Sequence, residues 1–572
     1  MTGRSRGRRG RNRRSGPGWS SGGTGPRRVI GLILVGIVAL GALVVASGVW
    51  PGSSGSFRSA APGGSAAASG ATSRGVSPSG SNMASARASA EASASGGASE
   101  SPGVPSRSVD LAVVSGFDNY KVTSVTATSL ASSLNAGTLI VPCGAEAPIA
   151  KALKTSAQGA AACVAADQIT ASLDPASTKL ALLPPALVTP RVKVVPLAGA
   201  DLFGEKPARD KLYPLRIATP ASWPAAWSQW SSTDVQVVVV TGVTCPDRGV
   251  SRQTVVLEKG WDWLLRAGTA RYTGTHFDGR FGWNVVDAVR TGDSGTLVNL
   301  LKNADITESD FECQMTARFT QHNTGTLFTI DPAVAPMLAR AGFDVATLAS
   351  DHMTAPYLSA VVETANDFRK AGIQPTGGGA NLNEALEPAV IDAGGLKFGF
   401  VGLNAIGSSI PATATRAGTA TLTAANAKAA IDRAKAAGAQ VIIALPQWSH
   451  TEYHANFTAF QASLVKVLTD AGADHIVGAD FHWAGGLQIS RDGSGYRYVG
   501  SSQGNFWFGQ DWSRQTEEGV ITSLAFVGTH LAQVRLTPTV VLDNAQVNLT
   551  NPATDGQFVL QQVLGATTLP SR

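Results

Sequence analysis

Residues 236–243, QVVVVTGV, decide the fold class of this chain. Their continuously apolar, β-branched side chains are typical of a strand that is buried on both faces of a sheet. Later strands are expected at 343–348, 397–403, 441–445 and 475–477. Helical spacing over 424–437 and 457–471 is followed each time by a glycine, Gly438 and Gly472, as at many helix ends. This alternation predicts an α/β sheet with functional loops at the carboxyl ends of its strands.

Polar side chains follow these strands where such loops are expected. The candidates are Arg248 in TGVTCPDRGV (241–250), Asp310 and Glu312, Asp351 and His352, Gln447, His450 and Glu452, and Asp480 and His482. Carboxylates and imidazoles that converge from separate strands suit a divalent metal such as manganese, iron or zinc. For any one of these residues alone, a solvated loop position is the favoured interpretation. The motifs Asp-His, Asp-x-His and Asp-x-Glu together favour a metal site.

Residues 1–50 have the organisation of a membrane anchor. Residues 1–28 hold nine arginines and no acid, and residues 29–50 contain no charge. A helix of that length spans about 33 Å, enough for a bilayer core of about 30 Å. The arginines predict a cytoplasmic N-terminus, so the chain is expected to be a single-pass protein of the cell membrane with its main domain extracellular. A cleaved signal peptide is the alternative, since Ala46-Ser47-Gly48 offers small residues.

The remaining sequence divides into three parts. Residues 51–107, rich in Ser, Gly and Ala, predict a disordered linker because they have hardly a large apolar side chain to bury. Residues 108–232 predict a small α/β domain, and LALLPPALVTPRVKVVPLAGADLF within them loosely resembles the second lobe of periplasmic substrate-binding proteins. Residues 233–572 form the main predicted domain. Outside the arginine tail, 37 Lys and Arg stand against 40 acidic residues, so a nucleic-acid partner is not indicated.

Four motifs in residues 236–510 resemble the CapA family of poly-γ-glutamate capsule synthesis. They are FDVATLASDH, GIQPTGGGANLNEALEPAVIDAGGLKFGFVG, DAGADHIVGADFHWAGGLQI and GSSQGNFWFGQ. The CapA domain is similar to calcineurin-like metallophosphoesterases. The resemblance therefore implies a four-layer αββα sandwich with a metal centre, here preceded by the small domain, the linker and the transmembrane helix.

The resemblance also implies roles for individual residues. His352 matches a proton donor and Arg248 the arginine of the first motif, both counted as catalytic candidates. Glu312, Asp351, Asp480 and His482 match metal-binding positions, and nearby His450 is a substitute ligand. Other expected pocket residues are Asp310, Gln447, Asn381 and Asn505.

Two departures from the family pattern weaken a two-metal centre. Val243 stands where the family has a metal-binding aspartate, and Gln447 stands where it has a histidine. The expected cofactor is a divalent metal: manganese, iron, magnesium or zinc, with oxygen-rich ligation favouring magnesium, manganese or calcium over zinc. A single-metal or rewired centre and a metal-free pseudoenzyme both remain open.

The expected function is synthesis, export or attachment of an extracellular polymer. One hypothesis is a metal-dependent hydrolase or transferase acting at a phosphoester or related linkage. The other is a non-catalytic polymer-binding or assembly subunit, and a weaker third makes residues 109–230 a small-molecule sensor. Expected partners are the polymer or its precursor, the membrane, and other capsule-synthesis membrane subunits.

The implied fold places Cys245 and Cys313 on one rim, which predicts a disulfide between them. Cys143 is then left to pair with Cys163, and four free, buried cysteines are the alternative. His276, His322, His475 and His530 have no carboxylate neighbour in a motif and are expected to be structural.

Overall fold

The computed structural model describes residues 107–155, 163–448, 453–493 and 495–570. By its contacts the chain divides into two compact units, Met1–Gly97 and Ala98–Arg572. The expected arginine tail (1–28), transmembrane helix (29–50) and nearly all of the linker (51–107) lie outside the described residues, as does His450. No helix within the described residues is long and apolar enough to cross a membrane.

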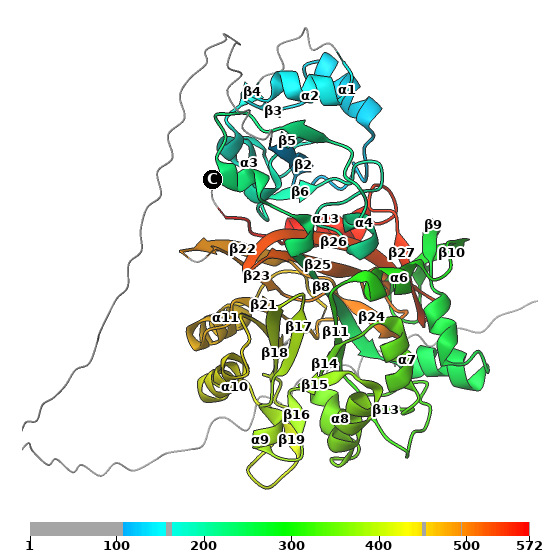
Figure 1. The fold of residues 1–572 in the computed structure, drawn as a ribbon. Coiled ribbons are helices and arrows are strands. Elements are labelled where there is room, and N and C mark those ends of the chain that lie inside the picture. Colours follow the sequence, from blue (N-terminus) through cyan, green and yellow to red (C-terminus); the bar gives the residue numbers. More distant parts are fainter. Residues whose placement is uncertain (1–106, 156–162, 449–452, 494, 571–572) are drawn as a thin grey trace, which may run out of the picture. The chain divides into compact units, whose positions relative to one another are not determined.

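A large sheet and a six-stranded sheet form the main part of the second unit (Figure 1). The large sheet has the order β10 (Trp283–Gly292), β9 (Thr269–Asp278), β27 (Gln546–Thr550), β26 (His530–Leu542), β25 (Glu518–Val527), β8 (Val235–Cys245), β11 (Ile306–Phe311), β14 (Val345–Thr347) and β15 (Gln374–Thr376), with β24 (Asn505–Phe508) also paired to β8. The second sheet has the order β17 (Ala389–Ala393), β18 (Leu396–Asn404), β20 (Val441–Gln447), β21 (His475–Val477), β23 (Gly495–Gly500) and β22 (Leu487–Asp492).

Strand β8 is buried along its whole length, as its valines predict. Because side chains alternate along a strand, Val238 and Val240 join the apolar core that also contains Phe398 of β18, while Val237 and Val239 face the opposite core. The two sheets therefore pack against each other through one core, and β8 contributes to the cores on both of its faces.

Helices cover the outer faces of both sheets. The helices α6 (Thr296–Asn303), α7 (Val334–Ala341) and α8 (Ala360–Ala371) bury apolar side chains in the core on the outer side of β8. On the other side, α10 (Ala424–Ala436) and α11 (Ala459–Ala471) pack on β18, β20 and β21. Gly438, with φ of 90°, follows α10, and Gly472, with φ of 102°, caps α11. The predicted α/β class is confirmed.

The segment before β8 has its own three-stranded sheet, β5 (Ala181–Leu183), β2 (Ala112–Gly116) and β6 (Val192–Val194). It packs against the large sheet: the backbone N–H of Val194 donates to the side chain of Gln533 at 2.9 Å. The buried Arg209 also forms an ion pair with Asp305 at 2.9 Å.

Short helices and two-stranded pairs complete the unit Ala98–Arg572 on both sides of β8 in the chain. They are α1 (Ala127–Asn135), α2 (Glu146–Ala152), α3 (Ile169–Ser172), α4 (Lys206–Arg209), α5 (Arg248–Ser251), α9 (Leu382–Ala385), α12 (Arg514–Glu517), α13 (Gln557–Gly565), β1 (Ser108–Asp110), β7 (Arg216–Ala218), β3 (Val141–Pro142), β4 (Cys163–Val164), β12 (Gln314–Met315), β13 (Thr329–Ile330), β16 (Gly378–Gly379) and β19 (Gly418–Thr419).

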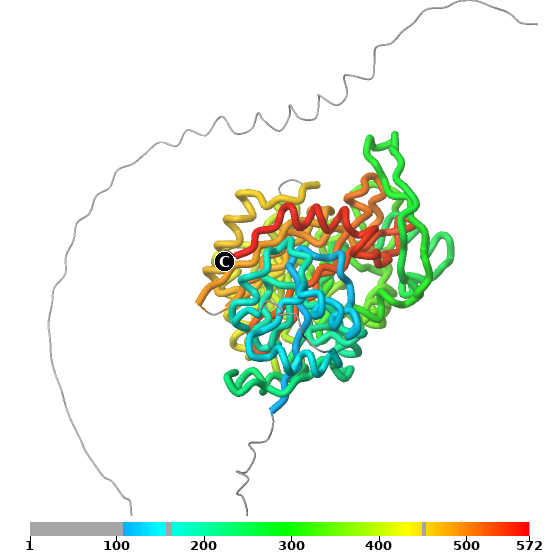
Figure 2. The backbone as a smooth tube through the Cα atoms, turned by 90° about the horizontal axis from the view of Figure 1, so that it is seen from above, coloured from blue at the N-terminus to red at the C-terminus, as the bar shows by residue number. Residues whose placement is uncertain are grey.

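The hairpin formed by β9 and β10 lies at the edge of the large sheet and projects from the rest of the unit (Figures 1 and 2). Its two strands pair antiparallel from Asp278 and Trp283 at the tip down to Thr269 and Gly292. No strand is predicted from the sequence at these residues. Most of the hairpin is exposed, so its residues lack the continuous apolar pattern that identifies β8.

Candidate functional site

The candidate residues lie where parallel strands of the two sheets end. In the large sheet, β8, β11 and β14 run parallel, and Asp310 on β11 is in register with Val243 on β8 and Thr347 on β14. In the second sheet, Gln447 is the last residue of β20, and Asp480 and His482 follow β21. These residues therefore lie at the carboxyl ends of parallel strands.

Three carboxylates occupy one face of β11 and the residue after it. Glu308, Asp310 and Glu312 alternate with Ser309 and Phe311, so their side chains share a face. All three are buried. Glu308 was not among the predicted site residues, although the alternation of acids in ESDFE was the sequence signal that could have identified it.

Burial and mutual repulsion raise the pKa values of these acids. Burial, reinforced by the charge of Asp351, raises the pKa of Asp310 to about 7. Burial and then the charges of Asp310, Asp480 and Asp351 raise the pKa of Glu312 well above its ordinary value, against a hydrogen bond from Gln447 that lowers it. These interactions place four carboxylates in one electrostatic cluster.

Gln447 links the two sheets at this cluster. Its side-chain N–H donates to Glu312 Oε1 at 3.1 Å and to Ser350 Oγ at 3.2 Å. Its side-chain oxygen, Oε1, accepts the backbone N–H of Asp351 at 2.7 Å. Ser350 Oγ in turn donates to the backbone oxygen of Glu312 at 2.9 Å. The Gln447 amide thus holds Glu312 and Asp351 in place, and Ser350 is a further residue of this network that the sequence did not indicate.

The loop after β21 holds its functional side chains through a strained backbone. Asp480 has φ of 98° and His482 has φ of 58°, both in the region that non-glycine residues rarely adopt. His482 Nδ1 lies 2.9 Å from Asn505 Oδ1. Burial lowers the pKa of His482 to about 4, although the hydrogen bond to Asn505 acts in the opposite direction. His482 is therefore a neutral imidazole at pH 7, the form that can bind a metal.

Arg248 and His352 both contact the ring of Phe328. The Arg248 guanidinium packs 4.9 Å from the Phe328 ring and 5.0 Å from the Phe508 ring. The Phe328 ring also meets the imidazole of His352 edge-on at 4.8 Å. His352 Nε2 is 3.7 Å from Asp351 Oδ1. Phe328 and Phe508 were not predicted as site residues, because ring contacts between segments far apart in the chain leave no spacing pattern in the sequence.

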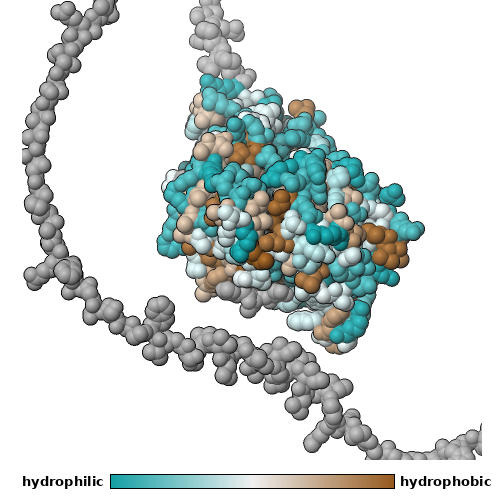
Figure 3. Space-filling view, turned by 90° about the horizontal axis from the view of Figure 1, so that it is seen from below, coloured by the Kyte–Doolittle hydropathy of each residue, from teal (hydrophilic) through white to brown (hydrophobic). Residues whose placement is uncertain are grey.

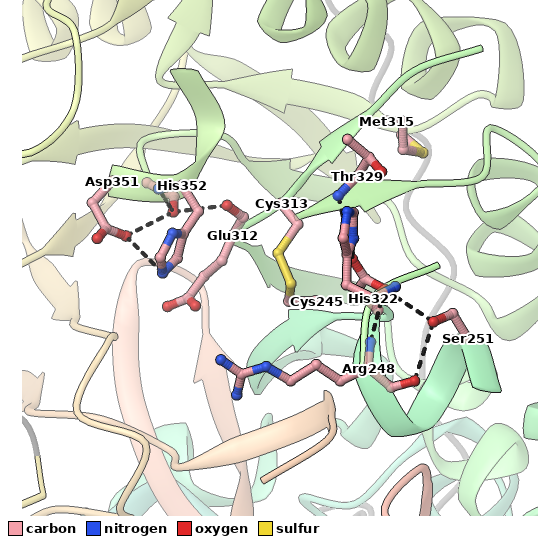
Figure 4. The surroundings of a disulfide bond; sticks show 12 residues. Cys245, Arg248, Ser251, Glu312, Cys313, Met315, His322, Thr329, Asp351 and His352 are labelled. Carbon is pink, nitrogen blue, oxygen red and sulfur yellow. Dashed lines mark hydrogen bonds and ion pairs between the residues drawn. A yellow bond between two sulfur atoms is a disulfide. The ribbon is translucent and has the colours of Figure 1, made fainter. Parts of the chain in front are cut away.

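The Cys245–Cys313 disulfide lies beside Arg248 and Glu312 (Figure 4). It joins the end of β8 to the residue after Glu312, with its Cα atoms 5.2 Å apart. In Figure 4 the side chain of Arg248 extends past this disulfide towards the side on which the Glu312 carboxylate lies. The second disulfide, Cys143–Cys163, closes a separation of 20 residues in the N-terminal segment. Both predicted pairings are confirmed.

Asp247 organises the chain immediately before Arg248. It is fully buried, and its Oδ2 lies 2.6 Å from His322 Nδ1. Its Oδ1 accepts the backbone N–H groups of Arg248 at 2.8 Å and His322 at 3.0 Å, and the hydroxyl of Ser251 at 3.0 Å. No sequence motif pairs His322 with a carboxylate, because its partner Asp247 is 75 residues away.

The expected pocket residue Asn381 makes its contacts elsewhere. Its side chain caps α9, accepting the backbone N–H of Glu384 at 3.0 Å and donating to the Glu384 carboxylate at 3.2 Å. Asn505, in contrast, contacts His482 and donates to Gln510 and to the backbone of Thr516. Of the two predicted asparagines, only Asn505 contacts a predicted ligand through these bonds.

The donor chemistry of the acidic cluster fits a hard divalent cation. Asp310 Oδ2 and Glu312 Oε2 are buried oxygens without a hydrogen-bond partner among the described residues. A cation would relieve their desolvation and mutual repulsion. The expected ligands nevertheless do not form a compact set. Across the described ranges, one trio of His, Cys, Asp or Glu has its ligand atoms within 4.8 Å of one another, and that trio is Cys143, Glu146 and Cys163, whose sulfurs are bonded together.

Comparisons with known proteins agree with the sequence motifs. Residues 291–510 match the model of the family described as bacterial capsule synthesis protein PGA_cap. A capsule biosynthesis protein CapA of Bacillus anthracis is 25% identical over 229 residues, which is 39% of this chain and 54% of that protein. The chain thus matches about half the length of this curated relative.

Two solved structures are similar over part of the chain. A 5′-nucleotidase precursor from Thermus thermophilus shares 14% identity, covering 57% of this chain and 58% of its own, with a TM-score of 0.33. The calcineurin-like phosphoesterase YfkN from Bacillus subtilis shares 13% identity over 57% of this chain and 98% of its own, with a TM-score of 0.26. TM-scores this low support no argument about function.

Proposed function

We propose that this chain, which belongs to the CapA family through residues 291–510, acts on a capsule polymer outside the cell membrane, with one divalent cation at the acidic strand-end site. The observation that carries the proposal is the pair of buried oxygens, on Asp310 and Glu312, that have no hydrogen-bond partner among the described residues. Buried carboxylates without partners cost several kcal/mol unless they are protonated or bind a cation, and clusters of this kind occur preferentially at functional sites.

The cation would neutralise the buried carboxylates of Asp310 and Glu312, and the charge of Asp480 also acts on Glu312. When bound, it would polarise a phosphoryl or carbonyl oxygen of the polymer linkage. Oxygen ligands favour magnesium or manganese over zinc here.

The surrounding side chains have separate tasks in this proposal. His352, which is partly exposed and 3.7 Å from Asp351, would donate a proton to the leaving group. Arg248, held between aromatic rings, would attract a negatively charged part of the substrate. Gln447 would keep Glu312 and Asp351 in fixed positions through its hydrogen bonds.

A second function is favoured by the same Gln447 contacts. An amide that occupies Glu312 Oε1, together with the apolar side chain of Val243 at the strand end, leaves fewer ligands than a two-metal centre needs. The alternative is an assembly subunit that holds the polymer without turnover. The membrane anchor, the extracellular location and partner subunits of capsule synthesis are part of both proposals.

Metal analysis of the purified full-length chain separates the proposals. Elemental analysis after dialysis should find about one manganese, magnesium or iron ion per chain. Asp310→Asn and Asp480→Asn should remove it, whereas Asp432→Asn, at an exposed carboxylate on α10, should not. Metal-free wild-type protein without thermal stabilisation by added manganese would overturn the metal-dependent proposal. It would leave the assembly subunit as the better explanation.

A further inference from the structure

Residues 255–289 expose most of the large apolar side chains at the surface of the described structure. Of the eleven large hydrophobic side chains that are exposed among the described residues, seven belong to this span. They are Val255, Val256, Leu257, Phe277, Phe281, Trp283 and Val289, with exposed fractions between 38% and 64%. Elsewhere such residues are scattered, and the face drawn in Figure 3 is mostly hydrophilic with separate hydrophobic patches. A local concentration of exposed apolar side chains marks an interaction surface.

The seven side chains lie on two protrusions. One is the aliphatic tip, defined here as Val255, Val256 and Leu257, which follows α5 at the end of a single π-helical turn. The other is the β9–β10 hairpin, which projects from the rest of the unit (Figures 1 and 2). Trp263 connects them, because its ring lies 5.7 Å from the guanidinium of Arg290 on β10. The two protrusions therefore belong to one side of the molecule.

Cationic side chains lie over aromatic rings on both protrusions. Lys259 Nζ is 4.2 Å from the ring of Trp263, and the Arg280 guanidinium is 5.1 Å from the ring of Phe281. Aliphatic and aromatic side chains with Lys and Arg beside them are typical of protein segments that lie in the interface of a lipid bilayer. There the apolar groups enter the acyl region while the cations stay at the headgroups.

The charges on this side of the molecule nearly balance. Residues 252–290 contain six Lys and Arg and four acidic residues. Their ion-pair partners outside this span bring the totals to seven and six; these partners are Arg340, Asp511 and Asp543. The apolar side chains, rather than a net charge, must therefore carry any binding to this surface, and the binding should depend little on salt.

A bilayer is the occupant that the rest of the sequence favours. The predicted transmembrane helix (29–50) and linker (51–107) precede the described residues. A Ser/Gly-rich chain of this length reaches about 40 Å. The radius of gyration expected for the unit Ala98–Arg572 is about 23 Å, so any face of it can reach the bilayer. Tethering of this kind gives effective concentrations of about 1 mM or more, so a weak contact is sufficient.

We propose that the aliphatic tip and the β9–β10 hairpin dock this protein on a lipid bilayer. Both protrusions are connected to the candidate site. Arg248 begins α5, which leads directly to the aliphatic tip. The ring of Phe281 lies 5.7 Å from Trp512, and Trp512 lies 5.4 Å from the Arg248 guanidinium. Docking therefore brings Arg248 close to the lipid headgroups, where the site meets a polymer or precursor that is still attached to the membrane. The inference rests on the proposed function for its membrane location, but not on metal or turnover.

Fluorophores at single cysteines test the docking in the full-length chain. All four native cysteines are paired in disulfides, so an introduced cysteine alone carries the label. The substitutions are Val256→Cys, Phe277→Cys and, as the matched control, Leu212→Cys, whose exposed apolar side chain lies in the N-terminal segment. The labelled chains are reconstituted in phosphatidylcholine liposomes with or without brominated acyl chains, which quench an NBD label that enters the bilayer.

The labels at the two protrusions should be quenched at least about twofold by the brominated lipid, because interfacial segments bury their apolar groups about 5–10 Å deep. The label at Leu212 should remain unquenched. An increase from 0.1 M to 0.5 M NaCl should change the quenching by less than about a tenth. Quenching that salt abolishes would mean that charge holds the protein to the surface, which would contradict docking by apolar insertion.

The other outcomes separate this inference from the proposed function. Flotation with the liposomes reports the predicted anchor: a chain that floats while the labels at Val256 and Phe277 stay unquenched overturns the docking and leaves the membrane location standing. A chain that does not float overturns both. Labels that are shielded in native membranes but not in liposomes would assign the surface to a partner protein and overturn the inference. Asp310→Asn should lose its metal with unchanged quenching, so failure of the metal site is seen separately.

Discussion

The side-chain amide of Gln447 donates a hydrogen bond to Glu312 Oε1 across 3.1 Å, joining two residues 135 positions apart. The bond connects the end of β20 in one sheet to the end of β11 in the other. The same amide accepts the backbone N–H of Asp351, so one side chain joins the three polar segments of the site. Removal of the Gln447 amide should therefore lower the stability of the fold as well as impair function.

Replacing Gln447 with leucine should lower the free energy of unfolding by about 2–4 kcal/mol. The substitution preserves volume but leaves the buried groups of Glu312, Ser350 and Asp351 without their partner, and each unsatisfied group costs about 1–3 kcal/mol. Urea denaturation followed by tryptophan fluorescence measures the change. Gln229→Leu, at an exposed position, is the control and should change stability by less than about 0.5 kcal/mol. Equal stability of Gln447→Leu and the wild type would show that the amide does not hold the site together.

The two disulfides should differ in their contribution to stability. The Cys245–Cys313 bond closes 68 residues and Cys143–Cys163 closes 20. Loop-closure entropy grows slowly with length, so removing the first pair should cost about 1 kcal/mol more than removing the second. Thermal unfolding of Cys245→Ala/Cys313→Ala and Cys143→Ala/Cys163→Ala compares them directly. If the shorter loop contributed more, native-state packing rather than chain entropy would govern both.

Glu517 should make the attachment of the hairpin dependent on pH. Its Oε2 accepts the backbone N–H of Val286 on β10 at 2.7 Å. Burial raises the pKa of Glu517 from 4.5 to about 8, and the hydrogen bond from Val286 only partly opposes this. The folded state therefore binds the proton more tightly than the unfolded state does. The contribution of Glu517 to the free energy of unfolding is fully present below pH 4.5 and is lost as the pH rises towards 8.

Glu517→Gln should remove this part of the pH dependence because glutamine keeps an acceptor for Val286 and does not titrate. Free energies of unfolding measured between pH 5 and pH 8 should fall more steeply for the wild type than for the variant. Glu258→Gln, at an exposed position, should keep the wild-type slope. Parallel slopes for wild type and Glu517→Gln would contradict the assignment.

The sequence predicted the regular elements well because burial leaves a pattern in them. The stretch 236–243 lies within β8, the predicted strand at 397–403 lies within β18, and Gly472 ends α11 as expected. The β9–β10 hairpin was missed because it is mostly exposed. Only a buried strand or an alternating one carries a strong periodic signal.

Within the site, motif residues could be predicted and their partners could not. Glu312 and Asp480 follow strands, and parallel strands bring their ends together, so sequence order was sufficient. The pairing of His322 with Asp247 and the contact of Phe328 with Arg248 join the irregular segment that holds His322 and Phe328 to the start of α5. Their positions depend on backbone geometry that no spacing rule specifies.

Asp247 should control the position of Arg248. The fully buried carboxylate fixes the first turn of α5 through the backbone N–H of Arg248, whose own φ is 46°. Asp247→Asn retains the size of the side chain but loses one acceptor oxygen and the charge that pairs with His322 at 2.6 Å. We expect a loss of about 3–5 kcal/mol in the free energy of unfolding, the range for breaking a buried ion pair by removing one partner. His322→Asn tests the same pair from its partly exposed partner and should cost less, because the carboxylate keeps its backbone donors. A double-mutant cycle should give a coupling of about 1–3 kcal/mol between the two positions. Additive effects would mean that Asp247 holds Arg248 through its backbone bonds alone.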